Sequence, residues 1–253
     1  MNIKSFLKTA QMVGKLYIRD FAGPFFSVIF PIGMMLLFGG IYGNEPSPLY
    51  GYSRGAMDVM IPALLGMVIA VSGIMTLPLN LSEYMSTKVY KRFDATPVGK
   101  GNIIGVQIFI YVLAALVSAA IVIIAGRLLY NVNIDGNPLI IIFAILLSCA
   151  AVFSMGFFIA AVFKSGKVAQ VVSYIVYFVM IFLSGATIPL EIMPENMRGY
   201  ANVLPLTHVV SLLQNTFAGQ PIAEQFTAII VLLGIIIVCG VLGAISYRRR
   251  NMA

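Results

Sequence analysis

Long apolar runs alternate with short charged stretches along the chain, and this pattern predicts its elements. Asp, Glu, Lys and Arg are absent from residues 21–44, 59–82, 101–126, 136–163, 168–190, 199–223 and 225–247. A helix needs about 20 mainly apolar residues to cross a bilayer, and every stretch except 199–223 is strongly apolar. We therefore predict an all-α integral membrane protein with six transmembrane helices, at about 21–43, 58–82, 101–128, 138–163, 168–190 and 225–247.

The stretch 199–223 differs from the others because it is rich in Asn, Gln, Ser and Thr and contains His208. Such side chains are costly inside lipid unless they are paired or wetted. Pro189, Pro194 and Pro205 fall in or just before this stretch, and they interrupt any single helix. The apolar residues between the prolines still favour burial, so we expect residues 188–220 to form an external re-entrant hairpin before the last span.

Residues 2–19 carry apolar side chains at helical spacing, with basic side chains on another face. The apolar set is Ile3, Phe6, Leu7, Ala10, Val13 and Tyr17, and the basic set is Lys4, Lys8, Lys15 and Arg19. This pattern is typical of an amphipathic helix that lies in the membrane interface. We predict such a helix over 1–20, before a six-helix domain over 21–253, and keep open the alternative of a basic tail that only sets topology.

Charge then orients the spans. Composition is 60% hydrophobic with only 10% charged residues, against roughly 25% charged in soluble domains. With six spans, one side of the membrane receives Lys4, Lys8, Lys15, Arg19, Lys88, Lys91, Arg92, Lys100, Lys164, Lys167 and Arg248 to Arg250. The other side receives only Arg54, Arg127 and Arg198. The positive-inside rule places both termini in the cytoplasm, so the net charge of +7 needs no nucleic-acid partner.

Candidate chemistry is sparse. His208 is the single histidine, and Cys149 and Cys239 lie in apolar runs, so no metal site is expected. The sequence has no P-loop and no set of residues for nucleophilic catalysis, which argues against an enzyme. The spans also lack the charged residues that ion-coupled carriers place at mid-membrane. We expect no cofactor in this chain, and we interpret the loop over 43–56 as a structurally bland external turn.

The segment 83–98 is a short charged island between two apolar runs, and it ends in Ala95-Thr96-Pro97-Val98. In a chain that is nearly all membrane, such a segment is a place for a soluble partner to bind. A second string of interest follows the fifth span. It contains Ile188-Pro189-Leu190-Glu191 and Met193-Pro194-Glu195, and then Leu204-Pro205-Leu206-Thr207-His208.

The amphipathic N-terminus, the six spans and these two strings, in this order, resemble the permease half of ATP-binding-cassette type 2 exporters along nearly the whole chain. The resemblance implies that 1–20 is a connecting helix and that 83–98 couples to an ATPase through Glu83, Lys88, Lys91, Arg92, Phe93, Thr96 and Pro97. It places Pro189, Glu191, Pro194, Pro205 and His208 at an external gate. The segment has fewer Glu residues than is usual, and it lacks the Gly-Thr pair that often occurs in the family.

The resemblance also implies that spans two and five line the translocation path. The residues concerned are Met60, Leu64, Met67, Val71, Met75, Tyr174, Tyr177, Phe178, Ile181 and Phe182. Methionine and aromatic groups make a deformable apolar wall, which suits amphipathic or hydrophobic cargo such as a drug, an antibiotic, a peptide or a lipid. Ordinary helix packing is the alternative for each of these residues.

The implied partners are a dimer of ABC ATPase subunits that bind ATP and Mg²⁺, a second permease that is either an identical copy or a paralogue, and the lipid bilayer. The implied location is the cytoplasmic membrane of a prokaryote. Two other classes stay open at the level of sequence: a self-contained channel or carrier, and a membrane scaffold that transports nothing.

Overall fold

The structure is a computed structural model that describes residues 3–48, 54–86, 100–163, 165–187 and 195–252, and within these residues it is all helical. The helices before the first gap are α1 (Ile3–Arg19), α2 (Ala22–Pro24), η1 (Phe25–Ile29) and α3 (Phe30–Tyr42). The next are α4 (Ala56–Ala70), η3 (Val71–Thr76), α5 (Leu77–Ser86), α7 (Lys100–Tyr130) and α8 (Pro138–Val162). The last are α9 (Gly166–Leu183), α10 (Glu195–Ala201), α11 (Pro205–Phe217), η5 (Ile222–Gln225) and α12 (Phe226–Met252).

Six helical segments among the described residues are long and apolar enough to cross a membrane, as the apolar pattern predicts. They are Phe25–Tyr42, Ala56–Glu83, Ile103–Tyr130, Pro138–Val162, Gly166–Leu183 and Ile222–Arg249. The second of these consists of α4, η3 and α5, which follow one another without a break. The π-helical turns η1 and η3 interrupt the α-helical geometry of the first and second spans.

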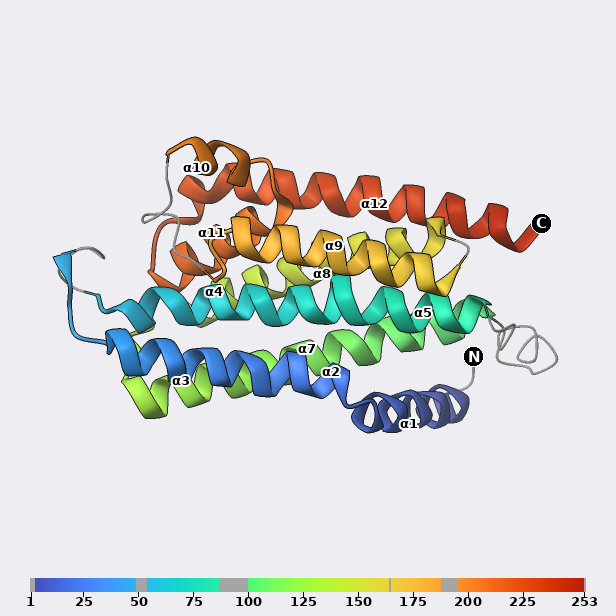
Figure 1. Cartoon of the computed structure of the whole chain (residues 1–253), viewed down its shortest axis with the longest axis horizontal. Coiled ribbons are helices and arrows are strands. Elements are labelled where there is room, and N and C mark those ends of the chain that lie inside the picture. Colours follow the sequence, from blue (N-terminus) through green and yellow to red (C-terminus); the bar gives the residue numbers. More distant parts are fainter. Residues whose placement is uncertain (1–2, 49–53, 87–99, 164, 188–194, 253) are drawn as a thin grey trace.

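The long helices run side by side, and Figure 1 shows two distinct ends. At the α5 end, on the right of the figure, α5 and α12 end and α1 begins. At the α11 end, on the left, α3 ends and α4 begins, and α10 and α11 lie there as well. The short helices α10 and α11 therefore gather at the end of the bundle opposite to α1.

Local sequence explains where several helices begin. The side-chain oxygen of Asn137 accepts a hydrogen bond from the backbone N–H of Leu139 at 2.9 Å, and Pro138 occupies the first position of α8. Proline is suited to this position because it has no N–H to leave unpaired. Pro205 begins α11 in the same way. Pro138 and Pro205 thus start helices.

The core of the bundle is built around α4, η3 and α5. Every residue from Ala56 to Pro78 is buried except the partly buried Val59. This central helix contacts α3, α7, α8, α9 and α11, while α12 packs mainly against α8. The second span is therefore enclosed by the other helices, although its sequence is apolar enough to cross a membrane.

Candidate functional site

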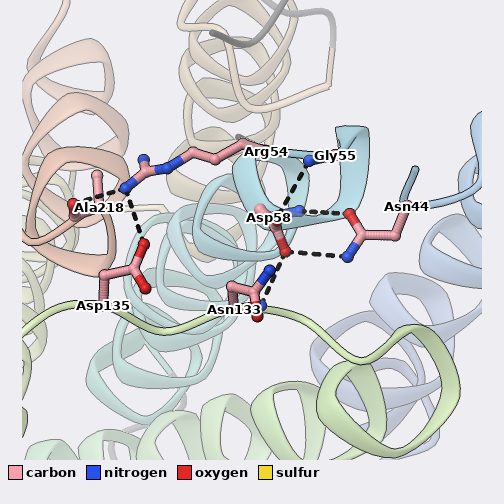
Figure 2. Close-up of polar contacts among 7 residues, drawn as sticks. All are labelled: Asn44, Arg54, Gly55, Asp58, Asn133, Asp135 and Ala218. Carbon is pink, nitrogen blue, oxygen red and sulfur yellow. Dashed lines mark hydrogen bonds and ion pairs between the residues drawn. The ribbon is translucent and has the colours of Figure 1, made fainter. Parts of the chain in front are cut away.

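The first turn of α4 contains a buried carboxylate, Asp58, that connects three segments of the α11 end. Its Oδ1 accepts hydrogen bonds from Asn44 Nδ2 at 3.0 Å and from the backbone N–H of Asn133 at 2.9 Å. Its Oδ2 accepts from the backbone N–H of Gly55 at 3.0 Å. Figure 2 shows these partners converging on Asp58 from the loop after α3 and from the loop between α7 and α8. We call Asn44, Gly55, Asp58 and Asn133 the Asp58 network.

Asn44 completes the Asp58 network from the other side. Its Oδ1 accepts from the backbone N–H of Asp58 at 3.2 Å, and its Nδ2 also donates to the carbonyl of Tyr130, the last residue of α7, at 3.0 Å. Asp58 itself is 6% exposed. A buried carboxylate is tolerated when its oxygens accept several hydrogen bonds, so the network stabilises the start of α4 against the ends of α3 and α7.

Arg54 connects the same loop to α11. Its guanidinium donates to the carbonyl of Ala218 at 2.6 Å and pairs with the Asp135 carboxylate at 3.3 Å (Figure 2). The carbonyl of Phe217 accepts from the backbone N–H groups of Asp135 and Gly136. Carbonyls at the end of a helix have no partner within the helix and favour a cation nearby. Arg54 and the loop between α7 and α8 therefore cap the end of α11.

The N-terminal turn of α11 is held by polar contacts with the residues before it. The Thr207 hydroxyl donates to the carbonyl of Ala201 at 2.6 Å, and His208 Nε2 lies 3.0 Å from the carbonyl of Asn202. These contacts join the end of α10 to the start of α11. His208, expected at an external gate, thus makes a structural contact within this turn.

One face of α11 packs on α4. Leu206, Val209, Val210 and Leu213 are buried, and a Cβ atom added at Gly66 of α4 would lie 3.0 Å from Val210 Cγ2. The polar side of α11 is partnered as well, since Gln214 Nε2 donates to the carbonyl of Val59 at 3.2 Å. The polar groups that set 199–223 apart in the sequence are therefore largely satisfied within the protein.

Halfway along the second span, the backbone of η3 approaches that of the neighbouring helix α8 closely. A Cβ atom added at Gly156 of α8 would lie 1.8 Å from the carbonyl oxygen of Gly73. A Cβ added at Gly73 would lie 2.8 Å from Val152 Cγ1. Only glycine fits at such a contact, so α8 and η3 touch through their backbones. π-Helical turns are frequent at functional sites.

The residues expected to line a translocation path fall into two environments. Met60, Leu64, Met67, Val71 and Met75 of the second span are buried within the chain, as are Tyr177 and Ile181 of α9. Tyr174 is partly buried, and its hydroxyl accepts from Gln170 Nε2 at 3.1 Å. Phe178 and Phe182 are about half exposed on α9, and their rings stack with centroids 6.3 Å apart.

A small cavity marks the place where α4 approaches the end of α9 and α11. Met60 and Leu64 line it from α4, Gly185 and Ala186 from the residues after α9, and Gln214 from α11. Its volume is about 10 Å³, which is close to the smallest cavity that holds one water molecule. This cavity beside Met60 and Leu64 is therefore too small for cargo.

The N-terminal helix α1 packs against α7 at the α5 end. Val13 and Tyr17 are buried, and the Tyr17 ring meets the Tyr111 ring edge-on with centroids 5.1 Å apart. The Tyr17 hydroxyl lies 2.9 Å from Ser27 Oγ. Burial raises the pKa of the Tyr17 phenol; the Ser27 hydrogen bond lowers it and the Asp20 charge raises it further.

Most residues of the expected coupling segment lie outside the described residues. These are Lys88, Lys91, Arg92, Phe93, Thr96 and Pro97, and the same holds for Pro189, Glu191 and Pro194 of the expected gate. Glu83 is described, and it is exposed near the end of α5. Among the described residues, no group of three or more His, Cys, Asp or Glu side chains could hold a metal ion.

The Asp58 network and Arg54 were missed by the sequence reasoning, and the interpretation of 43–56 as a bland turn is wrong. Asn44, Arg54 and Gly55 of this loop hydrogen-bond to α4, α7 and the end of α11. One sequence signal was available, because Asp58 follows Gly55 by three residues at the start of a helix. An acidic residue at this position often caps the first turn.

Comparison with known proteins adds two findings. A family model described as "ABC-2 family transporter protein" matches residues 42–245, which is most of the chain. Nodulation protein J of Rhizobium leguminosarum bv. viciae is 40% identical over 73 residues, which are 29% of this chain. The matched part spans only 28% of the length of that relative.

Proposed function

Because the chain belongs to the ABC-2 family of transporter proteins, we propose that it is the permease subunit of an exporter. Membership makes it the membrane component of an ABC-2 type transporter, and its sequence contains no P-loop. In the proposal, a separate pair of ABC ATPase subunits hydrolyses ATP with Mg²⁺. The cargo is amphipathic or hydrophobic, in the range of a drug, an antibiotic, a peptide or a lipid, and it moves outward across the cytoplasmic membrane of a prokaryote.

The observation that carries this proposal is the buried central helix formed by α4, η3 and α5. It begins at the Asp58 network and ends at Ser86, so that its last turn contains Glu83 and forms the start of the segment 83–98. A displaced helix moves its neighbours when the packing between them leaves no empty space. A partner that pushes on 83–98 would therefore act on the α11 end of the molecule through this helix.

Charge supports an orientation with the α5 end in the cytoplasm. Figure 1 shows that α1 begins and α12 ends at this end. Lys8 and Lys15 of α1 and Arg248 and Arg249 of α12 are exposed. On α1, Leu7, Leu16 and Ile18 are exposed while Val13 and Tyr17 pack inward. Apolar side chains that remain exposed beside basic ones fit a helix in the lipid interface, as we propose for α1.

The length of α11 supports a re-entrant position on the external side. Its 13 residues extend about 20 Å, less than the roughly 30 Å of the hydrocarbon core. Its capped C-terminal end and its internal hydrogen bonds lower the cost of placing polar backbone groups below the membrane surface. We propose that α10 and α11 close the external side of the path.

The two environments of the path residues favour a path shared by two permease copies, either identical or paralogous. Phe178 and Phe182 of α9 face outward and are available to a second copy. Met60, Leu64 and Met67 would reach cargo only when α9 and α11 separate from α4. In the proposal, ATP-driven displacement of the central helix causes this separation.

The proposal is tested by co-purification with an ABC ATPase subunit and by ATP turnover of the reconstituted complex. We expect Arg92→Ala and Phe93→Ala each to weaken ATPase binding at least about tenfold, because hot-spot residues of this kind contribute more than 1.4 kcal/mol. Arg249→Ala and Phe226→Ala are matched controls that change an exposed cation and an exposed phenylalanine elsewhere. Equal assembly and turnover in all four variants would exclude the coupling role of 83–98.

A further inference from the structure

An open groove of about 360 Å³ lies between α7 and α8 at the α11 end. Leu116, Ala120 and Ile123 line it from α7, Ile142 from α8, and Phe217 from α11. All of its lining side chains are apolar except one, Arg127, near the end of α7. The groove belongs neither to the Asp58 network nor to the expected path residues.

The depth of the groove matches one leaflet of a bilayer. From Leu116 to Arg127, α7 advances by eleven residues, which is about 16 Å along a helix. One leaflet contributes about half of the roughly 30 Å hydrocarbon core. An acyl chain in the groove would therefore lie within a single leaflet, and its polar end would be level with Arg127.

Arg127 is exposed, and within the described part of the chain it has no hydrogen-bond or ion-pair partner. The nearest acid in the loop between α7 and α8, Asp135, is paired with Arg54 at 3.3 Å. A guanidinium can bind two phosphate oxygens at once, which makes arginine well suited to phosphate. The mouth of the groove thus offers a cation where a lipid headgroup would lie.

We propose that this groove binds an anionic phospholipid, with one acyl chain between α7 and α8 and the phosphate on Arg127. The apolar walls select a hydrocarbon chain, and the single unpaired cation selects a negatively charged headgroup. The site depends only on the chain spanning a membrane, so it holds or fails independently of the proposed export function. A bound lipid of this kind would fill the space between α7 and α8 beside the buried Phe217.

The absence of tryptophan from the sequence allows a direct test. One reporter, Ile142→Trp, lies in the groove. A matched reporter, Ile124→Trp, lies on α7, where it is exposed and outside the groove. The full-length chain with either reporter is reconstituted in phosphatidylcholine vesicles that contain increasing fractions of phosphatidylglycerol with brominated acyl chains, which quench tryptophan on contact.

We expect the groove reporter to reach half-quenching at about fivefold lower phosphatidylglycerol than the control, which corresponds to one cation near an anionic lipid surface. Arg127→Ala should abolish this difference, and Arg127→Lys should retain part of it. Equal quenching of both reporters, or a difference unchanged by Arg127→Ala, would overturn the proposal. A groove reporter that brominated phosphatidylglycerol does not quench at any fraction would also overturn the proposal, and if brominated phosphatidylcholine does not quench that reporter either, protein, such as a second copy, covers the groove.

Discussion

The second and sixth spans have equal length but opposite surroundings. Each candidate span has 28 residues, yet 94% of the apolar window in Ala56–Glu83 is buried, against 17% in Ile222–Arg249. The buried span is also the less apolar of the two. In a soluble protein the more apolar helix would be the one inside. Here the bilayer accepts the more apolar helix, and the protein interior accepts the one that carries Asp58, Ser72 and Thr76.

The different surroundings of the two spans show what holds helices together in a bilayer. Lipid tails are as apolar as leucine side chains, so burying apolar side chains does not favour association there. Association then depends on close backbone contact at small residues and on hydrogen bonds between helices. The second span has both, at Gly73 against Gly156 and at the Asp58 network. In the sixth span Gly234 and Gly240 have open space around them, whereas Gly243 packs against Phe157 of α8. The comparison therefore predicts that the same substitution has different effects in the two spans.

The largest effect is expected for Gly156→Ala, because the added methyl group would lie on the carbonyl oxygen of Gly73. We expect a loss of about 3 kcal/mol in the free energy of unfolding, at the upper end for overpacking. Denaturant unfolding in detergent, followed by circular dichroism, measures it. Gly240→Ala is the matched control, and it should be neutral or stabilising by up to about 1 kcal/mol. Equal denaturant midpoints for Gly156→Ala and Gly240→Ala would contradict the claim that close backbone contact stabilises the second span more than the sixth.

The next effect is expected for Asp58→Ala, which leaves donors on Asn44, Gly55 and Asn133 without their acceptor. The expected loss is about 2 kcal/mol, since buried donors lose their partner. Asp58→Asn keeps one acceptor oxygen and should lose about half as much. Glu224→Ala changes an exposed carboxylate at the start of the sixth span and should lie within about 0.5 kcal/mol of the parent. If Asp58→Ala is as stable as Glu224→Ala, the Asp58 network does not stabilise the protein.

The smallest effects are expected at Arg54, where two substitutions distinguish its contact with the end of α11 from its ion pair with Asp135. Arg54→Ala removes the cation at the end of α11, with an expected loss of about 1 kcal/mol. Asp135→Ala removes only the ion pair, whose carboxylate side chain is 61% exposed, so about 0.3 kcal/mol is expected. Unfolding at low and high salt measures both. If Asp135→Ala costs as much as Arg54→Ala, the ion pair and not the helix cap stabilises this corner.

Apolar periodicity and charge were sufficient to predict the six candidate spans and the first helix. The six candidate spans appear where charge-free stretches place them, and Ile3–Arg19 is a helix with Val13 and Tyr17 on its packed face. These features are local, because a run of apolar residues or a helical repeat is read within one segment. The polar stretch 199–223 was also set apart correctly from the spans, and it contains the short helix α11.

The contacts that connect helices were not predictable from a single sequence. Asn44 meets Tyr130 across 86 residues, and Asp58 meets Asn133 across 75. Nothing local pairs such residues. The same reason explains why apolar spacing did not show that Met67 and Val71 face the interior while Phe178 faces outward. In a span that is apolar on all sides, the pattern has no polar face from which an orientation could be inferred.

The π-helical turn η3 has a consequence for comparing this chain with its relatives. A π-turn accommodates one residue more than an α-turn, and each residue of an α-helix turns the chain by about 100°. A helical wheel drawn through the whole second span therefore assigns wrong faces after Val71. A relative whose second span is α-helical throughout would be one residue shorter between Val71 and Thr76. An alignment of this family should therefore allow a one-residue gap in the middle of the second span. Alignments ordinarily penalise gaps inside membrane helices.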